Sequence, residues 1–270
     1  MSSYLLGAET AEEGRAMSHK PAPQSAITCV YETKLAELLC NVSVTWCKTS
    51  TEHSLSIALD RPSKENHYTC KIDLKNCQYW GKKGLKSFEI EGKHADVYWD
   101  FRQVKFSNNP EPRSDYYVAL VCDQEIVLLL GDLKDDAYKR TRSKPCLEEA
   151  TLLRKKENVY GKRLFCTKAM LNEGEKEHDI VIENSISGLG EPEMWISIEG
   201  MVMIRIMNLN WRFRGNETIV VNNVPLQIFW DVHDWLFNNS DSSSGSCHGL
   251  FIFKPSTIEF YHFLYAWKIE

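Results

Sequence analysis

SFEIEGKHADVYWDFR, residues 87–102, is the stretch that decides the fold of this 270-residue chain. Apolar and polar side chains alternate on both sides of Gly92-Lys93, a dipeptide whose glycine can take the positive φ of a tight turn. Alternation with a period of two gives a strand one dry face and one wet face. The stretch therefore predicts an antiparallel hairpin with strands at 87–91 and 95–102.

Further runs with the same alternation precede this hairpin. Residues 42–46, 55–59 and 68–74 each place apolar side chains at every second position. Such runs are typical of strands in an antiparallel sheet that packs one face on a core and turns the other to water. They predict a β-rich first half of the chain.

A second hairpin and a short helix are expected next. Residues 116–122 and 125–130 flank Asp123-Gln124, and their near-continuous hydrophobicity predicts strands that are buried on both faces. Residues 132–142 predict one or two helical turns, with Asp132 as the N-cap. Residues 147–158 suit a helix or a strand by composition, and we favour a strand that turns at Gly161.

The second half of the chain aligns with the first, without a gap, at an offset of 131 residues. Residues 80–101 lie over residues 211–232, and two Trp–Trp matches at one offset are informative because only 8 of the 270 residues are Trp. The markers of this internal repeat are Trp80, Gly84, Trp99 and Asp100 in the first copy, and Trp211, Gly215, Trp230 and Asp231 in the second.

The repeat predicts an all-β architecture with little helix. Two tandem, related antiparallel β-sandwich or barrel-like modules fit it, and so does one pseudo-symmetric large sheet. We divide the chain into a polar, disordered leader at 1–24, a first β module at 25–132, a connector with a short helix or strand at 133–160, and a second β module at 161–270.

Composition narrows the classes of partner and compartment. The formal net charge is −5, so no overall basic field attracts nucleic acid. No apolar run reaches the roughly 20 residues of a membrane-spanning helix, and the N-terminus lacks the apolar core of a secretory signal. Nine Cys, an odd number, favour a reducing compartment. We expect a cytoplasmic protein that is also nuclear if the basic residues at 139–156 promote import.

Eleven short motifs resemble the plant domain-of-unknown-function family 868, and together they extend over nearly everything from residue 24 onward. They are QSAITCVY (24–31), VTWCK (44–48), SLSI (54–57), CKIDLK (70–75), KSFEI (86–90), PEP (110–112), VLLLGD (127–132), HDIVIE (178–183), WRFRGN (211–216), FWDVHDWLF (229–237) and LYAWK (264–268).

The resemblance implies a land-plant protein with a mostly β fold and no established activity. It brings no catalytic or binding residues to this chain. Members of the family usually have a longer segment between the strands at 251–253 and 264–268. Only residues 254–263 stand there in this chain, so we expect a tightened last hairpin.

Asp231, His233 and Asp234 form the most site-like cluster of the sequence. Asp and His two residues apart on a strand point the same way and can bind a metal. The first copy of the repeat has Asp100 and Arg102 in these places, and that pair cannot hold a metal. We therefore favour a structural polar or ionic pair in both copies, and we predict no metal and no cofactor.

Three functions remain open. The first is a non-catalytic scaffold that binds other proteins through sheet edges and loops, because the sequence contains no catalytic motif. The second is a carrier of a small apolar ligand inside a barrel, which needs a continuous apolar cavity. The third is an enzyme of unrecognised type, for which Asp231, His233 and Asp234 would be examined first.

Overall fold

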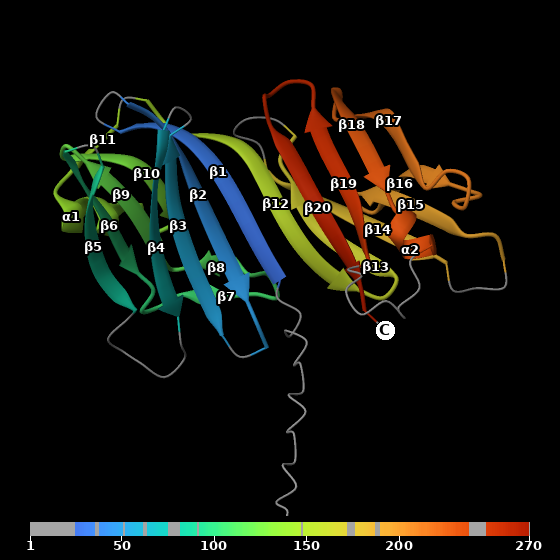
Figure 1. The fold of residues 1–270 in the computed structure, drawn as a ribbon, viewed down its shortest axis with the longest axis horizontal. Helices are drawn as coiled ribbons and strands as arrows, with labels where there is room; N and C mark the ends of the chain where they lie inside the picture. Colours follow the sequence, from blue (N-terminus) through green and yellow to red (C-terminus); the bar gives the residue numbers. More distant parts are fainter. Residues whose placement is uncertain are drawn as a thin grey trace, which may run out of the picture.

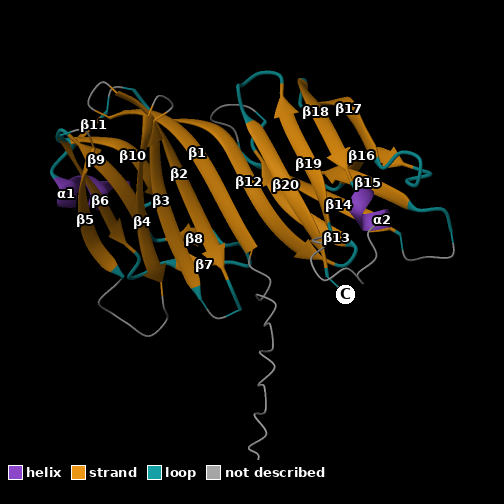
Figure 2. Ribbon diagram, viewed as in Figure 1, coloured by secondary structure: helices purple, strands orange, loops and turns teal. Residues whose placement is uncertain are grey.

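The computed structural model of the chain describes residues 25–35, 38–50, 52–61, 64–74, 82–90, 92–146, 148–171, 176–186, 190–237 and 247–269. Strands account for most of these residues and two short helices for few of them (Figure 2), which confirms the predicted all-β fold. The predicted leader at 1–24 and the repeat marker Trp80 lie outside the described residues. Neither helix of the described chain has the length and apolarity needed to cross a membrane.

A nine-stranded sheet runs across the whole molecule (Figure 1). Neighbouring strands pair antiparallel, except that β12 and β20 pair parallel. In order across the sheet the strands are β17 (Arg214–Val221), β18 (Val224–Asp231), β19 (His248–Pro255), β20 (Tyr261–Lys268), β12 (Thr151–Gly161), β1 (Ser25–Leu35), β2 (Leu38–Lys48), β3 (His53–Arg61) and β4 (Lys64–Leu74).

Two smaller sheets lie behind the large one in Figure 1. The five-stranded sheet has the order β11 (Lys144–Pro145), β10 (Glu125–Gly131), β9 (Tyr117–Cys122), β6 (Lys93–Asp100) and β5 (Lys83–Ile90). The four-stranded sheet has the order β13 (Leu164–Ala169), β14 (His178–Ser185), β15 (Glu193–Ile198) and β16 (Met201–Ile206). The strands β7 (Lys105–Phe106) and β8 (Pro112–Ser114) pair as a separate ribbon.

Both small sheets cover the same face of the large sheet. Pairing places Ile27 of β1 beside Glu157 of β12, and Glu157 beside Leu264 of β20. Directly opposite residues of paired strands point to one side of a sheet, so the buried side chains of β1 and β20 share a face. The large sheet and the five-stranded sheet form the first sandwich, and the large sheet and the four-stranded sheet form the second.

Each sandwich has its own core. Val42, Val44 and Trp46 of β2 pack in the first, and each is 1% exposed or less. Ile196 of β15 and Phe251 of β19 pack in the second and are fully buried. The two architectures that the sequence left open are thus combined, because two sandwiches share one large sheet. The strand that joins them is β12, which lies in the predicted connector.

The strand predictions for the first half are confirmed, and so is the burial of β9 on both faces. The outer face of β9 is covered by the helix α1 (Lys134–Thr141), whose Ala137 is fully buried. The prediction that Asp132 caps this helix was wrong, because the N-cap is Leu133. The Asp132 carboxylate instead accepts a hydrogen bond from the backbone N–H of Tyr116.

The repeat markers occupy matching places in two hairpins. Gly84 of β5 lies opposite Trp99 of β6, and Gly215 of β17 lies opposite Trp230 of β18. In both hairpins the Trp ring lies against the glycine so closely that a Cβ atom there would overlap it. A glycine is therefore required at both positions for the ring to lie flat on the neighbouring strand.

The offset between the halves changes along the chain. Asp100 pairs with Tyr117, whereas Asp231 pairs with Leu250, so the offset grows from 131 at the first hairpin to 133 at the next strand. A shift of two residues keeps every side chain on its own face. A common origin of the two halves stays a prediction, as do the boundaries drawn at 25, 132 and 160.

Candidate functional site

Buried charges lie where the two sandwiches meet. Lys155 and Glu157 of β12 point toward the core side of the large sheet and are 7% and 6% exposed. They are placed there because β12 pairs with β1 of the first sandwich and with β20 of the second. Charged side chains are rarely buried this deeply unless they are paired.

Three acceptors surround the ammonium group of Lys155. Its Nζ lies 3.1 Å from Glu157 Oε1 and 3.5 Å from Glu177 Oε1, and it donates a 2.9 Å hydrogen bond to the Lys168 carbonyl. Burial alone would lower the pKa of Lys155, but the two carboxylates outweigh burial and raise it above its ordinary value. Lys155 is therefore a permanent cation that ties β12 to the four-stranded sheet.

The carboxylate of Glu157 is held by three groups. Its second oxygen, Oε2, accepts a hydrogen bond from the Thr167 hydroxyl and lies 3.1 Å from His262 Nε2. Burial would raise the pKa of this carboxyl, but the charge of Lys155 and the hydrogen bonds from His262 and Thr167 lower it to about 2. Glu157 is consequently ionised at neutral pH.

His262 is fully buried beside Glu157. Burial lowers the pKa of this imidazole, and Glu157 offsets only part of that effect. A neutral imidazole facing an ionised carboxylate donates from Nε2, which leaves a bare lone pair on Nδ1. This agrees with the structure, in which Nδ1 is buried without a hydrogen-bond partner.

The arrangement of Thr167, His262 and Glu157 differs from that of a catalytic triad. In a triad the hydroxyl and the carboxylate engage opposite nitrogens of the imidazole. Here Thr167 Oγ1, at 3.5 Å, and Glu157 Oε2 both face Nε2. Because Nε2 carries the proton that it donates to Glu157, it has no lone pair to accept the proton of the Thr167 hydroxyl, and the imidazole cannot act as its general base.

A pocket of about 280 Å³ opens beside this network. Its floor includes Lys155 and Glu157, and one wall comes from β13 and the residues that precede β14. The loop between β7 and β8, which carries Glu111, also lines the pocket. The loop is anchored by Lys48, whose Nζ donates to the carbonyls of Ser107 and Asn108 at 3.2 and 3.1 Å.

The opposite, outer face of the large sheet carries a second candidate site. Outward-facing Tyr261, Phe263, Tyr265 and Trp267 follow one another along β20 and alternate with buried residues. The neighbouring strand β12 pairs Arg154 with Tyr261 and Lys156 with Phe263, so a column of two exposed cations lies beside a column of rings. Trp267 stacks on Tyr160, with 6.0 Å between their ring centroids.

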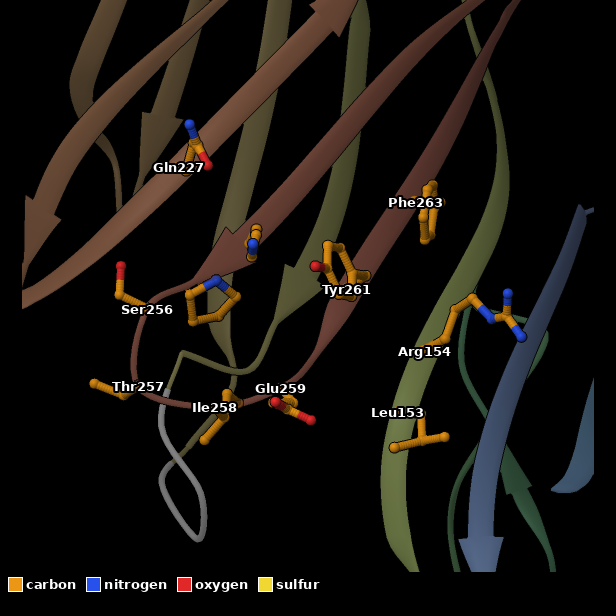
Figure 3. Close-up of a pocket in the computed structure, with 11 residues that line it drawn as sticks. Leu153, Arg154, Gln227, Ser256, Thr257, Ile258, Glu259, Tyr261 and Phe263 are labelled. Atoms are coloured by element: carbon orange, nitrogen blue, oxygen red, sulfur yellow. The ribbon is translucent and has the colours of Figure 1, made fainter. Parts of the chain in front are cut away.

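A groove of about 830 Å³ forms at one end of this face. Figure 3 shows Tyr261 and Phe263 on β20, Arg154 on β12, and Glu259 in the turn before β20. Lys254, which also lines the groove, holds its Nζ 5.2 Å from the centre of the Tyr261 ring. The groove therefore combines aromatic faces with two cations and one carboxylate.

The outer face is different in the first sandwich. There β2 and β3 place Ser43 beside Ala58 and Thr45 beside Ser56 on the outward side. These side chains are small, so the described part of β2 and β3 carries no column of rings like that of β20.

The metal candidates Asp231, His233 and Asp234 lie together at the end of β18. The prediction that Asp231 and His233 share a strand was wrong, because His233 begins the helix α2 (His233–Phe237). Asp231 Oδ1 accepts the backbone N–H of His233 at 3.1 Å, and Asp231 Oδ2 accepts from Arg214 Nε at 2.7 Å. Over the part of the chain that the structure describes, no three metal-binding side chains gather.

Asp100 repeats this local geometry in the first sandwich. Asp100 Oδ1 accepts the backbone N–H of Arg102 at 3.2 Å, and Lys83 Nζ lies 3.5 Å from Asp100 Oδ2. Each Asp thus ends its strand with a side-chain turn and pairs with a cation of the preceding strand. Burial would raise the pKa of Asp100, but the hydrogen bonds and charge of Arg102 hold it below its usual range.

Other aromatic residues with chemical interest have separate places. Trp235 is buried beneath Gly249 and donates from Nε1 to the carbonyl of Ala266. Phe237 is 48% exposed and contacts His233. The repeat marker Trp211 is 86% exposed in the turn that follows β16, so it has no core role.

The sequence interpretation missed both sites that the structure brings forward. Lys155, Glu157 and His262 come from two strands that are far apart in the chain. The sequence predicts a strand at 264–268 but not the aromatic column that β20 presents on its outer face. A signal was present in residues 154–158, where both faces of a predicted strand are polar although a central strand normally has a dry face.

Comparison with known proteins identifies a family. The family model described as plant protein of unknown function (DUF868) matches residues 22–267. No curated protein and no solved structure matches the chain. Since the family model covers nearly the entire length, the chain belongs to the plant proteins of unknown function that make up the DUF868 family.

Proposed function

We propose that this protein is a non-catalytic interaction scaffold of the plant cell, and that the outer face of its second sandwich binds an extended acidic segment of a partner protein. The observation that carries the proposal is the column of rings on β20 beside the cations of β12, next to a groove. Apolar surface that is concentrated on one exposed face marks an interaction site.

The chemistry of the groove favours an acidic, extended occupant. Arg154 and Lys254 outnumber Glu259 among its charged residues, and Lys156 adds a third cation beside Phe263. Rows of aromatic side chains suit extended segments, whose prolines and apolar residues lie flat on the rings. Alternate acidic residues of such a segment would reach the cations of β12.

A nucleic acid is a poorer fit to the same surface. Binding of a phosphate backbone depends on many cationic contacts and on an overall basic field. This chain has a net charge of −5, and its cations on this face are few. A protein segment with several acidic residues needs only local complementarity.

The other two functions have less support. A carrier of an apolar ligand needs an internal cavity, whereas side chains pack the described interior of both sandwiches. An enzyme has no candidate triad in the Thr167–His262–Glu157 group. A reducing, cytoplasmic or nuclear setting and a duplicated origin of the halves belong to the same proposal. The odd number of cysteines, nine, favours that setting.

Peptide selection tests the proposal directly. A random twelve-residue phage library is panned on the full chain and, separately, on the variants Arg154→Glu, Lys254→Glu and Lys71→Glu. We expect acidic, proline- or aromatic-containing sequences that bind the wild type and the control Lys71→Glu. They should lose binding on Arg154→Glu and Lys254→Glu by roughly 10-fold or more. Lys71 is a suitable control because it is exposed on the same sheet, in β4.

The selection can also contradict the proposal. It fails if no sequence is enriched, if the enriched sequences are basic, or if they bind all three variants equally. Tight binding of a single-stranded RNA probe that depends on Arg154 would replace the protein partner by a nucleic acid.

A further inference from the structure

The pocket at the junction is separate from the groove of the proposed docking surface, because no residue lines both. Six charged side chains line it, four acidic and two basic. They are Glu111, Glu157, Glu177, Asp179, Lys155 and Lys168. The pocket therefore has two more acidic groups than basic ones.

Both lysines are already engaged. Lys168 Nζ lies 3.2 Å from Asp179 Oδ1 at the rim. Lys155 has three N–H donors, and its three close acceptors are Glu157, Glu177 and the Lys168 carbonyl. The three donors of Lys155 are thus taken up by these acceptors, and neither lysine forms an ion pair with Glu111.

Glu111 is the group that is left over. It lines the pocket, and its carboxyl forms no hydrogen bond or ion pair with another described residue. Burial raises its pKa, and the charge of Lys155 offsets only part of that rise. Glu111 is partly exposed, so water reaches its carboxyl, but it is the acid of this pocket that has no partner among the described residues. A partly desolvated carboxylate in a pocket with an excess of acidic groups favours a cationic partner from outside the chain.

We propose that this pocket binds a compact organic cation, a primary ammonium or a guanidinium group, through the carboxylate of Glu111. A guanidinium or ammonium group supplies several N–H donors and a full charge, which match an unpaired carboxylate. The volume of about 280 Å³ suits a small group, because pockets for drug-sized ligands begin at roughly 300 Å³. A free amine and the side chain of a partner protein share this chemistry.

Binding is coupled to protonation. Lys155, Glu157 and Glu177 face Glu111, and Cys29, Tyr31 and Tyr116 lie close enough to feel its charge. A cation beside Glu111 lowers the pKa of that carboxyl. Molecules in which Glu111 is protonated therefore release a proton when the cation binds. Affinity for the cation should therefore fall as the pH is lowered.

Isothermal titration calorimetry on the full chain tests the site. The probes are agmatine for a free cation, the peptide Gly-Arg-Gly with blocked ends for a side chain, and magnesium chloride for a metal ion. The variants are Glu111→Gln, which removes the charge, and Glu148→Gln, an exposed acid that pairs with Lys34 and serves as the matched control. Far-ultraviolet circular dichroism checks that each variant is folded.

We expect a dissociation constant in the millimolar range or below for agmatine if the natural ligand is a free cation, and for the arginine peptide if it is a side chain of a partner protein. Glu111→Gln should weaken binding roughly 10- to 100-fold, and Glu148→Gln should leave it unchanged. Arg154→Glu on the outer face should also leave it unchanged, which separates this site from the docking surface. In wild type, titrations in buffers of different ionisation enthalpy should reveal proton release, a readout that needs no variant.

Three results would overturn the proposal. One is that neither agmatine nor the arginine peptide binds. Another is equal binding by wild type and folded Glu111→Gln. The third is binding of magnesium with no binding of agmatine or the peptide.

Discussion

Replacing Glu157 by Gln removes one charge from the buried ion pair and leaves the shape of the side chain almost unchanged. The Lys155 ammonium would then keep only the Lys168 carbonyl and Glu177, which is 3.5 Å away and half-exposed. A buried charge that loses its partner is strongly destabilising, commonly by about 3–5 kcal/mol. We therefore expect Glu157→Gln to lower the free energy of unfolding substantially.

The size of the effect follows from the pKa of Glu157. The folded protein lowers this pKa from 4.5 to about 2. At about 1.4 kcal/mol for each unit, the ionised carboxylate stabilises the fold by about 3 kcal/mol, as an order of magnitude. In a chain of this length such a loss would lower the melting temperature by roughly 6–12 °C.

A double-mutant cycle separates the ion pair from other effects. Lys155→Met removes the cation, and Lys155→Met combined with Glu157→Gln leaves two neutral side chains, of which the glutamine oxygen still accepts hydrogen bonds from His262 and Thr167. We expect the double variant to be more stable than the sum of the single losses predicts, by about 2 kcal/mol. Urea unfolding at pH 7.5, followed by tryptophan fluorescence and by circular dichroism, measures all four proteins.

The exposed pair Lys34–Glu148 is the matched control. Its atoms are 2.8 Å apart, and the side chains are 50% and 63% exposed. An exposed pair is worth about 1 kcal/mol or less, so Glu148→Gln should unfold almost as wild type does. The reasoning is refuted if Glu157→Gln and Glu148→Gln cost the same, or if the losses in the cycle are simply additive.

Two further predictions concern acid and packing. His262 has a lowered folded pKa, so the unfolded chain takes up a proton near pH 6.5 that the folded chain does not. The free energy of unfolding should fall as the pH drops from 7.5 to 5.5, by up to about 1.4 kcal/mol for each pH unit. It should fall further below about pH 4.5, where the unfolded chain takes up a proton on Glu157 that the folded chain does not. Urea unfolding between pH 7.5 and pH 5.5 measures how steeply the free energy of unfolding depends on pH. This dependence should be weaker in His262→Gln than in wild type and unchanged in the exposed control His94→Gln. An equal pH dependence in wild type and both variants would contradict the assignment. Gly84→Ala and Gly215→Ala should each cost about 1–3 kcal/mol, because the new methyl overlaps the ring of Trp99 or Trp230. Gly190→Ala meets nothing within 4 Å and should melt with wild type in differential scanning calorimetry; equal melting temperatures for all three variants would show that the rings move aside freely.

Much of the fold was predictable because one-sided burial leaves a period of two in the sequence. Val42, Val44 and Trp46 alternate with polar residues for this reason, and they are buried as expected. The turn at Asp123-Gln124 was also predictable, and both residues take the positive φ of a tight hairpin. Alternation identifies strands but carries no information on which distant strands pair.

The sharing of one sheet by two sandwiches was therefore out of reach. It depends on the parallel pairing of residues 154–161 with 261–268, which no local pattern specifies. The same pairing brings His262 next to Lys155 and so creates the buried network. On β20 both faces are apolar, so alternation could not tell the outward Tyr265 from the inward Leu264.

Asp231 and His233 illustrate the opposite case. Their spacing predicted side chains on one face of a strand, but the strand ends at Asp231. It ends there because the Asp231 side chain binds the backbone N–H of His233 and starts a helical turn. Short polar side chains compete with strand pairing in this way, and the sequence alone does not show which interaction prevails.

Hydrogen–deuterium exchange of the full chain, with and without a saturating selected acidic peptide, tests the docking surface most directly. The account predicts slower amide exchange in the bound state at residues 254–265 and 152–156, which border the groove, and unchanged exchange at residues 107–111. Protection confined to the junction loop at 107–111, or to the edge strand β4, would contradict it.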